Sequence, residues 1–318
     1  MSALHAQDPP TFEYLFTIGA GGGVNPRIKA SGRWGRLFLG APERLSPLSV
    51  PAAVAVDQED RVWIADRGAA RLMMFDILGG QYKSIAGSPK VAFQCPSAID
   101  VDRMGMVYVA DACLGAVFVF DNDGVFERML VAKARGPRLK APSAILVSPD
   151  RKRVFIADPQ LHKVIVLNQE GESVQEWGQR GKAPLQFPTA LALDRTEKKV
   201  LVLDSQAGAI SSFTPGGEFT GSLRISRVPS PSAFAFDSEN RRYFVGDPQY
   251  EAVHVFSASG DLLASFGQSG SGLSECRVPQ SLTVDFRGRI FVVDPLNSKV
   301  LVFAETPSVP LQLPPPDK

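Results

Sequence analysis

The stretch RVWIADRGAARLMMFD, residues 61–76, consists of an apolar run that ends at Asp66, a short loop and a second apolar run. Five further stretches repeat it with aspartate again in sixth position: MVYVADACLGAVFVFD (106–121), RVFIADPQLHKVIVLN (153–168), KVLVLDSQAGAISSFT (199–214), RYFVGDPQYEAVHVFS (242–257) and RIFVVDPLNSKVLVFA (289–304). The motif aspartates, 43 to 47 residues apart, are Asp66, Asp111, Asp158, Asp204, Asp247 and Asp294. A repeat at this period indicates one structural unit used six times, rather than two unrelated domains.

Each unit opens with a proline and a short apolar run. The six openings are PAAVAVD (51–57), PSAIDVD (96–102), PSAILVS (142–148), PTALALD (188–194), PSAFAFD (231–237) and PQSLTVD (279–285). A third run such as AVFVFD (116–121) and a fourth such as VFERML (125–130) complete the unit. Four short β-rich segments bounded by Gly, Asp and Pro predict a four-stranded antiparallel meander, and a period of about 45 residues is typical of a propeller blade. The sequence therefore predicts an all-β, six-bladed β-propeller.

Closure of the ring requires one more strand. The sixth unit lacks a fourth run, since KVLVFA (299–304) is followed by a proline-rich tail, residues 305–318. The segment FEYLFTIG (12–19) resembles the fourth runs ESVQEWG (172–178) and DLLASFG (261–267). We therefore expect the N-terminal strand to complete the last blade, which removes free sheet edges that invite aggregation. This predicts one propeller over residues 12–304, preceded by a disordered tail over residues 1–11.

The units resemble NHL repeats, a family of six-bladed propellers. The family pattern is a proline, a small residue, an apolar residue, alanine, valine and aspartate, followed by a strand similar to YVAD, and MVYVAD (106–111), RVFIAD (153–158) and RVWIAD (61–66) match that strand. The chain departs from the pattern after the proline, where alanine or serine mostly replaces glycine, and after the aspartate, where asparagine and arginine are mostly absent. The opening of the chain also resembles exported bacterial members. The resemblance implies a fold and leaves the activity open.

Composition narrows the classes of partner. The net charge is +1 over 318 residues, and the basic residues are spread thinly, which disfavours a nucleic-acid binder. The sequence contains no run of eighteen apolar residues, so it predicts no transmembrane helix. The segment MSALHAQDPP (1–10) lacks the charged and apolar parts of a signal peptide, although ALHAQ (3–7) resembles a cleavage site. We expect an exported monomer, periplasmic or extracellular, with a cytoplasmic protein as the alternative.

The chain has three cysteines. Cys95 precedes the opening proline of one unit, Cys113 follows the aspartate of the same unit, and Cys276 is four units away. One interpretation is a Cys95–Cys113 disulfide with Cys276 free; the other is three unpaired cysteines that act as small apolar residues.

The motif aspartates end a strand at a tight loop, where a carboxylate accepts backbone N–H groups. Six regular copies favour this structural role over a ring of charge for a cation. Asp100 is different, because it lies within a first strand and by alternation shares with Ala98 a face that points toward the central channel. The equivalent positions hold Ala55, Leu146, Ala192, Ala235 and Thr283. A buried carboxylate needs a partner, and we expect a structural acid whose hydrogen bonds are satisfied.

The histidines, His5, His162 and His254, are too dispersed for the three protein ligands of a catalytic zinc. Zinc-dependent lyases occur among NHL propellers, and this chain lacks the histidine set expected for them. We therefore expect neither a metal site nor a cofactor.

A long insertion follows the first strand. From Gly19 to Pro51 is 32 positions, whereas the corresponding connection from Gly178 to Pro188 is 10. This connection lies on the face of the aspartate loops, because a meander alternates its turns between two faces. Residues 19–50 are therefore expected to cover one mouth of the channel.

The content of this insertion leaves two interpretations open. Trp34 and Phe38, among basic residues, either pack onto the propeller as a plug or form a surface for a protein partner or a membrane interface. The aspartate loops should add a mixed polar and aromatic set: Arg67, Gln160, His162, Gln206, Gln249, Tyr250 and Asn297.

We predict a non-catalytic binding scaffold for a protein or peptide, located in a bacterial cell envelope. Peripheral membrane contact through the insertion is a further option. The alternative is a lyase or hydrolase with a metal-assisted site near Asp100, at the mouth of the central channel.

Overall fold

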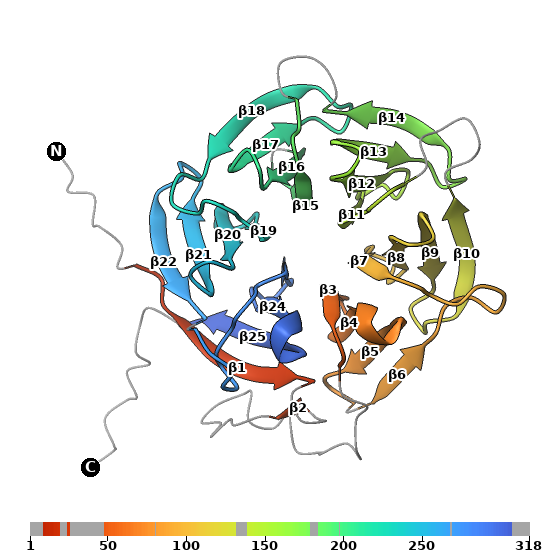
Figure 1. Ribbon diagram of the computed structural model, residues 1–318, viewed down its shortest axis with the longest axis horizontal. Coiled ribbons are helices and arrows are strands. Elements are labelled where there is room, and N and C mark those ends of the chain that lie inside the picture. The colour runs from red at the N-terminus through yellow and green to blue at the C-terminus, as the bar shows by residue number, and fades with distance from the viewer. Residues whose placement is uncertain are drawn as a thin grey trace, which may run out of the picture.

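The computed structural model describes residues 9–19, 24–25, 48–79, 81–131, 139–178, 184–196, 198–267 and 269–306. Six antiparallel sheets are arranged as blades around a central channel (Figure 1), which confirms the predicted six-bladed propeller. Within the part of the chain that the structure describes, no helix is long and apolar enough to cross a membrane.

The strands of the first three blades follow the repeat, and in each blade the first strand lies nearest the channel. Blade 1 contains β3 (Pro51–Val56), β4 (Arg61–Asp66), β5 (Arg71–Asp76) and β6 (Tyr82–Ile85). Blade 2 contains β7 (Pro96–Val101), β8 (Val107–Asp111), β9 (Ala116–Phe120) and β10 (Phe126–Val131). Blade 3 contains β11 (Ala144–Val147), β12 (Val154–Asp158), β13 (Lys163–Leu167) and β14 (Ser173–Trp177).

The remaining blades complete the ring, and two short 3-10 helices, η1 (Arg67–Ala69) and η2 (Pro295–Asn297), follow motif aspartates. Blade 4 contains β15 (Pro188–Asp194), β16 (Lys199–Asp204), β17 (Ala209–Phe213) and β18 (Phe219–Arg224). Blade 5 contains β19 (Ala233–Asp237), β20 (Arg242–Asp247), β21 (Ala252–Ser257) and β22 (Leu262–Phe266). Blade 6 contains β23 (Ser281–Val284), β24 (Ile290–Asp294), β25 (Lys299–Glu305), β1 (Phe12–Ile18) and the short β2 (Val24–Asn25).

The N-terminal strand closes the ring, as predicted. Strand β1 pairs antiparallel with β25, from Phe12 opposite Glu305 to Ile18 opposite Val300. Strand β2 then pairs with β1, so blade 6 has a fifth strand that the repeat pattern did not predict. The red β1 lies beside the blue β25 in Figure 1. The first and last strands of the chain therefore belong to one sheet.

The hydrophobic core lies between neighbouring blades. Val54 of blade 1 packs in one cluster with Phe16 and Phe291 of blade 6, whereas Ala55 packs toward Ile99 of blade 2. The two faces of a first strand thus contact two different blades, and small residues on one face allow the close approach. Ala98 lines the central channel together with Asp100, and it is also buried in the cluster that holds Ile145 and Val147 of blade 3.

Polar contacts tie the blades together on one face of the ring. We call this the turn face, because the turns between first and second strands lie there; the opposite face, with the motif aspartates, is the loop face. Across the closing boundary, Asp60 of blade 1 binds Arg287 and Arg289 of blade 6. Between blades 2 and 3, Arg151 Nε lies 2.7 Å from Asp102 Oδ2. These ion pairs fix the blades that surround the channel.

Candidate functional site: the loop face and the central channel

The motif aspartates hold the loop face rigid. Asp111 is buried and accepts four backbone N–H groups, from Gln94 at 2.7 Å, Cys95 at 3.0 Å, Cys113 at 3.0 Å and Leu114 at 3.1 Å. One carboxylate therefore fixes both its own loop and the two residues before the opening proline. In four other blades the corresponding two residues before the opening proline donate backbone N–H groups to the motif aspartate. They are Ser49 and Val50 for Asp66, Lys140 and Ala141 for Asp158, Gln186 and Phe187 for Asp204, and Arg277 and Val278 for Asp294. All five carboxylates are buried, and this arrangement gives them a structural function.

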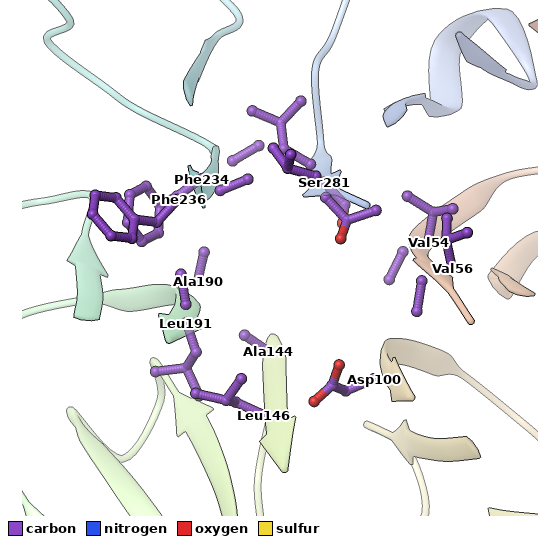
Figure 2. A pocket seen from close by; sticks show the side chains of 18 of the residues that line it. Val54, Val56, Asp100, Ala144, Leu146, Ala190, Leu191, Phe234, Phe236 and Ser281 are labelled. Atoms are coloured by element: carbon purple, nitrogen blue, oxygen red, sulfur yellow. The ribbon is translucent and has the colours of Figure 1, made fainter. Parts of the chain in front are cut away.

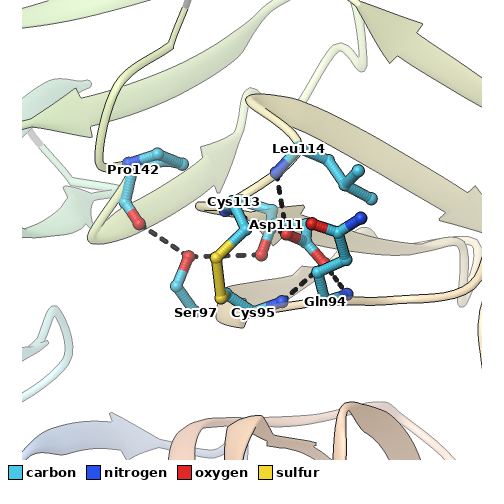
Figure 3. The surroundings of a disulfide bond; sticks show 8 residues. Gln94, Cys95, Ser97, Asp111, Cys113, Leu114 and Pro142 are labelled. Atoms are coloured by element: carbon cyan, nitrogen blue, oxygen red, sulfur yellow. Dashed lines mark hydrogen bonds between the residues drawn. A yellow bond between two sulfur atoms is a disulfide. The ribbon is translucent and has the colours of Figure 1, made fainter.

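A disulfide joins Cys95 and Cys113 beside the Asp111 contacts (Figure 3). The bond links the pre-proline residue to the loop after the aspartate, so it connects the same two segments as the carboxylate. Ser97 adds a contact to the next blade, since its hydroxyl donates to the Pro142 carbonyl oxygen at 2.7 Å. Cys276 is free and buried, and burial strongly raises the pKa of its thiol.

The predicted loop-face residues lie on the short loops of five blades, all except blade 2, around one mouth of the channel. Exposed side chains are Arg67, Gln160, His162, Gln206, Gln249 and Tyr250. Asn297 is half-buried, because its amide nitrogen donates to Asp294 Oδ2 at 2.7 Å and to the Gly270 carbonyl oxygen at 3.0 Å. Trp34 and Phe38 lie outside the described residues.

Sequence reasoning missed the apolar part of this face. Val50 is 44% exposed, Phe187 41% and Leu296 61%, and Tyr250 beside them is 61% exposed. Val50 and Phe187 occupy the pre-proline position, and Leu296 occupies the loop position that holds Gln160 in blade 3. The four residues belong to blades 4, 5, 6 and 1, which are consecutive around the ring. We call them the apolar arc.

Both described ends of the long insertion are anchored at the loop face. The backbone N–H of Val50 donates to Asp66 Oδ1 at 3.0 Å, and the Ser298 hydroxyl donates to the Ser49 carbonyl oxygen at 2.6 Å. Gly19, directly after the closing strand, lies next to Leu48. The insertion therefore leaves and rejoins the propeller on the face that holds the apolar arc.

The central channel is a cavity of about 1350 Å³. Its lining extends from Arg67 and Pro159 on the loop face to Arg103 and Arg195 on the turn face. Figure 2 shows first-strand side chains around it, mostly small or aliphatic, with the Asp100 carboxyl among them. Asp100 thus supplies a polar group to a largely apolar stretch of wall.

The neighbours of Asp100 explain its properties. Its Oδ2 accepts the backbone N–H of Val147, in the first strand of blade 3, at 2.7 Å. Burial raises the pKa of Asp100 to about 7, although the hydrogen bond from Val147 and the charge of Arg195 oppose the shift. The negative charge of Asp102, like burial, raises the pKa of Asp100. The carboxyl therefore changes charge near neutral pH.

The positions of the potential metal ligands do not support a metal site. Among the described residues, no group of three or more His, Cys, Asp or Glu side chains could hold a metal ion. His162 Nδ1 contacts the Gln186 carbonyl oxygen on the loop face, and His254 lies in β21 of blade 5. The two described histidines are therefore in different blades and away from Asp100.

Three solved structures illustrate what this chain resembles. A gluconolactonase from Xanthomonas campestris superposes with a TM-score of 0.65 at 18% identity, covering 81% of this chain and 86% of its own. A virginiamycin B lyase from Staphylococcus aureus gives a TM-score of 0.57 at 14% identity, with coverages of 84% and 86%. A chain of a nidogen/laminin complex gives 0.62 at 17% identity, with coverages of 86% and 98%.

These likenesses establish the propeller fold and nothing finer, because one fold hosts unrelated functions and all three identities are low. No protein-family model matches the chain, and no curated protein sequence matches it. The resemblance to NHL repeats therefore stays a prediction. The propellers that share this architecture include two enzymes and a chain of a protein complex.

Proposed function

We propose that this chain is a binding propeller whose loop face takes a protein or peptide partner. The observation that carries the proposal is the apolar arc, four large exposed apolar side chains on consecutive blades. Exposed apolar residues that gather on one face, with polar residues around them, are typical of an interaction site. The surrounding polar residues are Arg67, Gln160, Gln206 and Gln249.

The rigidity of the loops supports this proposal. Val50 and Phe187 donate backbone N–H groups to buried aspartates, and Tyr250 donates its own to Asp247 Oδ1 at 3.1 Å. A surface held in place before binding loses little conformational entropy when a partner docks. The arc therefore suits a partner of defined shape.

We also propose that the protein is exported, in a bacterial envelope. The Cys95–Cys113 disulfide supports this location, because disulfides persist in oxidising compartments and are rare in the cytosol. The test is fractionation of native cells, with the disulfide content of each fraction measured by thiol alkylation. A fully reduced, cytosolic protein would contradict the location and leave the binding face unaffected.

The binding test compares the two faces of the ring. In Tyr250→Ser/Leu296→Ser we expect loss of cross-linked partner from native cells, because the centre of the arc becomes polar. The matched control is Met104→Ser/Phe286→Ser on the turn face, where the side chains are 68% and 53% exposed. The control should retain the same cross-linked band. Equal capture by both double variants would contradict the proposal.

A second candidate function rests on Asp100. A channel carboxyl with a pKa of about 7 is poised to exchange a proton at neutral pH, which is what general acid–base catalysis requires. Arg103 and Arg195 line the same cavity and would attract an anionic substrate. This arrangement supports a lyase or hydrolase at the channel mouth.

The metal-assisted form of that candidate has a direct test. Elemental analysis of the purified protein should show a stoichiometric metal that Asp100→Ala removes. If the metal content is negligible or unchanged in the variant, Asp100 acts without a metal or has only a structural function.

A further inference from the structure

Blade 5 departs from the rule that governs the motif aspartates. In the other five blades, the two residues before the opening of the first strand donate backbone N–H groups to the aspartate. In blade 5 these residues are Pro229 and Ser230, and a proline has no N–H to donate. Asp247 keeps only the contacts from its own loop, with Gln249 and Tyr250, both to Oδ1. Its Oδ2 is buried and has no hydrogen bond.

A histidine lies at this unpartnered oxygen. His254 Nε2 is 3.4 Å from Asp247 Oδ2, and the His254 side chain is 15% exposed. The register places His254 where other third strands carry mostly buried apolar residues: Met73, Phe118, Ile165, Ser211 and Leu301. The loss of a donor at Pro229 and the gain of an imidazole at His254 therefore occur together in one blade.

The other ring nitrogen of this histidine contacts a hydroxyl. His254 Nδ1 lies 2.7 Å from Ser265 Oγ, and Ser265 is directly opposite His254 in the outer strand β22. An ionised carboxylate only accepts hydrogen bonds, so Nε2 carries the proton that faces Asp247. Nδ1 is then the lone-pair nitrogen, which accepts the proton of the Ser265 hydroxyl. The order carboxylate, imidazole, hydroxyl is that of a serine nucleophile with its general base.

We propose that Asp247, His254 and Ser265 form a second reactive site, with Ser265 as a nucleophile toward small esters. Ser265 Oγ attacks the ester carbonyl carbon while His254 Nδ1 takes the hydroxyl proton, and Asp247 stabilises the resulting imidazolium. The C–O bond to the leaving alkoxide breaks, His254 returns the proton to it, and an acyl-serine remains. Water, deprotonated by His254, then attacks the acyl carbon, so that one carboxylic acid is released and Ser265 is restored.

The position of Ser265 sets the class of substrate. Its side chain is exposed on β22, the outermost strand of blade 5, and it is not among the residues that line the central cavity. The site therefore lies outside the channel, although Tyr250 of the apolar arc contacts both Asp247 and His254. Small activated esters and phosphonyl electrophiles, which need no deep pocket, are the compounds that it should accept.

The test uses a fluorophosphonate probe and p-nitrophenyl acetate on the full chain. We expect one phosphonyl adduct, mapped by mass spectrometry to Ser265 and absent in Ser265→Ala. In His254→Gln and Asp247→Asn the labelling rate should fall by about 100-fold, the size expected when a general base is lost. Asn keeps an oxygen for the Gln249 and Tyr250 contacts, so that the Asp247 variant retains its loop.

The matched control is Ser84→Ala. Ser84 is an exposed serine in β6 that lies opposite Met73, at the register position equivalent to Ser265, and it lacks a histidine neighbour. Ser84→Ala should be labelled at the rate of the unmodified protein, and circular dichroism should show that every variant is folded. Absence of an adduct in the unmodified protein, or equal labelling of folded His254→Gln, overturns the proposal.

Discussion

Asp100 shows how one exception to a repeat changes local chemistry. Five blades carry an alanine, leucine or threonine where blade 2 carries this carboxyl. The backbone N–H of Val147 stabilises the charged form, yet burial has the larger effect and raises the pKa to about 7. Because the usual value is 3.8, the folded protein holds a proton on this group across a range of pH where the unfolded chain does not.

The difference in stability between the unmodified protein and an Asp100→Asn variant should therefore depend on pH. Well below the usual pKa of 3.8, the carboxyl is protonated in both the folded and the unfolded state, and the raised pKa does not affect stability there. As the pH rises toward 7, the folded state alone keeps the proton, so the unmodified protein loses stability and the uncharged variant does not. Relative to the unmodified protein, Asp100→Asn should gain up to a few kcal/mol between pH 4 and pH 8, since one pKa unit corresponds to about 1.4 kcal/mol.

Urea denaturation of both proteins at pH 4, 6 and 8 measures this difference. Asn can still accept the Val147 N–H, so the hydrogen bond is retained as an internal control. A stability difference that stays constant over this range would contradict the raised pKa of Asp100.

Individual residues are predictable to the extent that the repeat positions them. Alignment of the six loops is sufficient to place Gln160, Gln249 and Tyr250 on one face of the ring. The contact between His254 and Asp247 is not predictable in this way, since it depends on strand register and on the missing N–H of Pro229. The partner of Asp100, a backbone N–H from the next blade, has no signature in sequence.

At the level of elements, the connections between blades decide the shape of the loop face. In five of the six blades the connection is fixed by a buried aspartate, and in blade 2 also by the Cys95–Cys113 bond. The strand pattern is predictable because apolar runs, prolines and aspartates recur at fixed offsets. Strand β2 is not predictable, because two residues inside an unrepeated insertion carry no such pattern.

Reduction of the Cys95–Cys113 disulfide should lower the stability of the protein without unfolding it at room temperature. The bond joins residues 18 positions apart. A loop of about 15 residues corresponds to about 3 kcal/mol of stabilisation in the chain-entropy description. We expect dithiothreitol to lower the midpoint of thermal unfolding by several degrees, while Asp111 keeps the connection in place.

The control for this measurement is Cys95→Ala/Cys113→Ala. The double variant should unfold at the temperature of the reduced protein, and reductant should have no further effect on it. An unchanged midpoint for the unmodified protein in reductant would show that the four contacts of Asp111 alone hold this connection.

At the level of the whole molecule, the ring is held closed by contacts from both ends of the chain. Phe12 stacks on Phe266 of blade 5 with ring centroids 4.7 Å apart, and Phe16 is buried in the core between blades 6 and 1. Arg242 of blade 5 binds Glu305 at 2.8 Å. The N-terminal strand therefore contributes to both boundaries of the last blade.

Removing residues 2–19 should open the ring. Strand β25 would become an unpaired sheet edge, and exposed edges promote self-association. We expect light scattering to show oligomers and thermal unfolding to begin at a lower temperature. A synthetic peptide of residues 9–19 added in excess should restore the monomer. Deletion of residues 2–8 is the control, since β1 and all its contacts remain; if both deletions behave alike, β1 does not close the ring.

The pairing of β1 with β25 also sets an order of events during synthesis. Phe12–Ile18 leaves the ribosome before every other strand of the ring, whereas its partner, Lys299–Glu305, leaves it after all of them. At about 5–20 residues per second, the aromatic segment waits roughly 15–60 s without a neighbouring strand. Throughout that interval the nascent chain displays a β-prone apolar stretch without its partner strand, and the native ring forms only after Lys299–Glu305 has been synthesised.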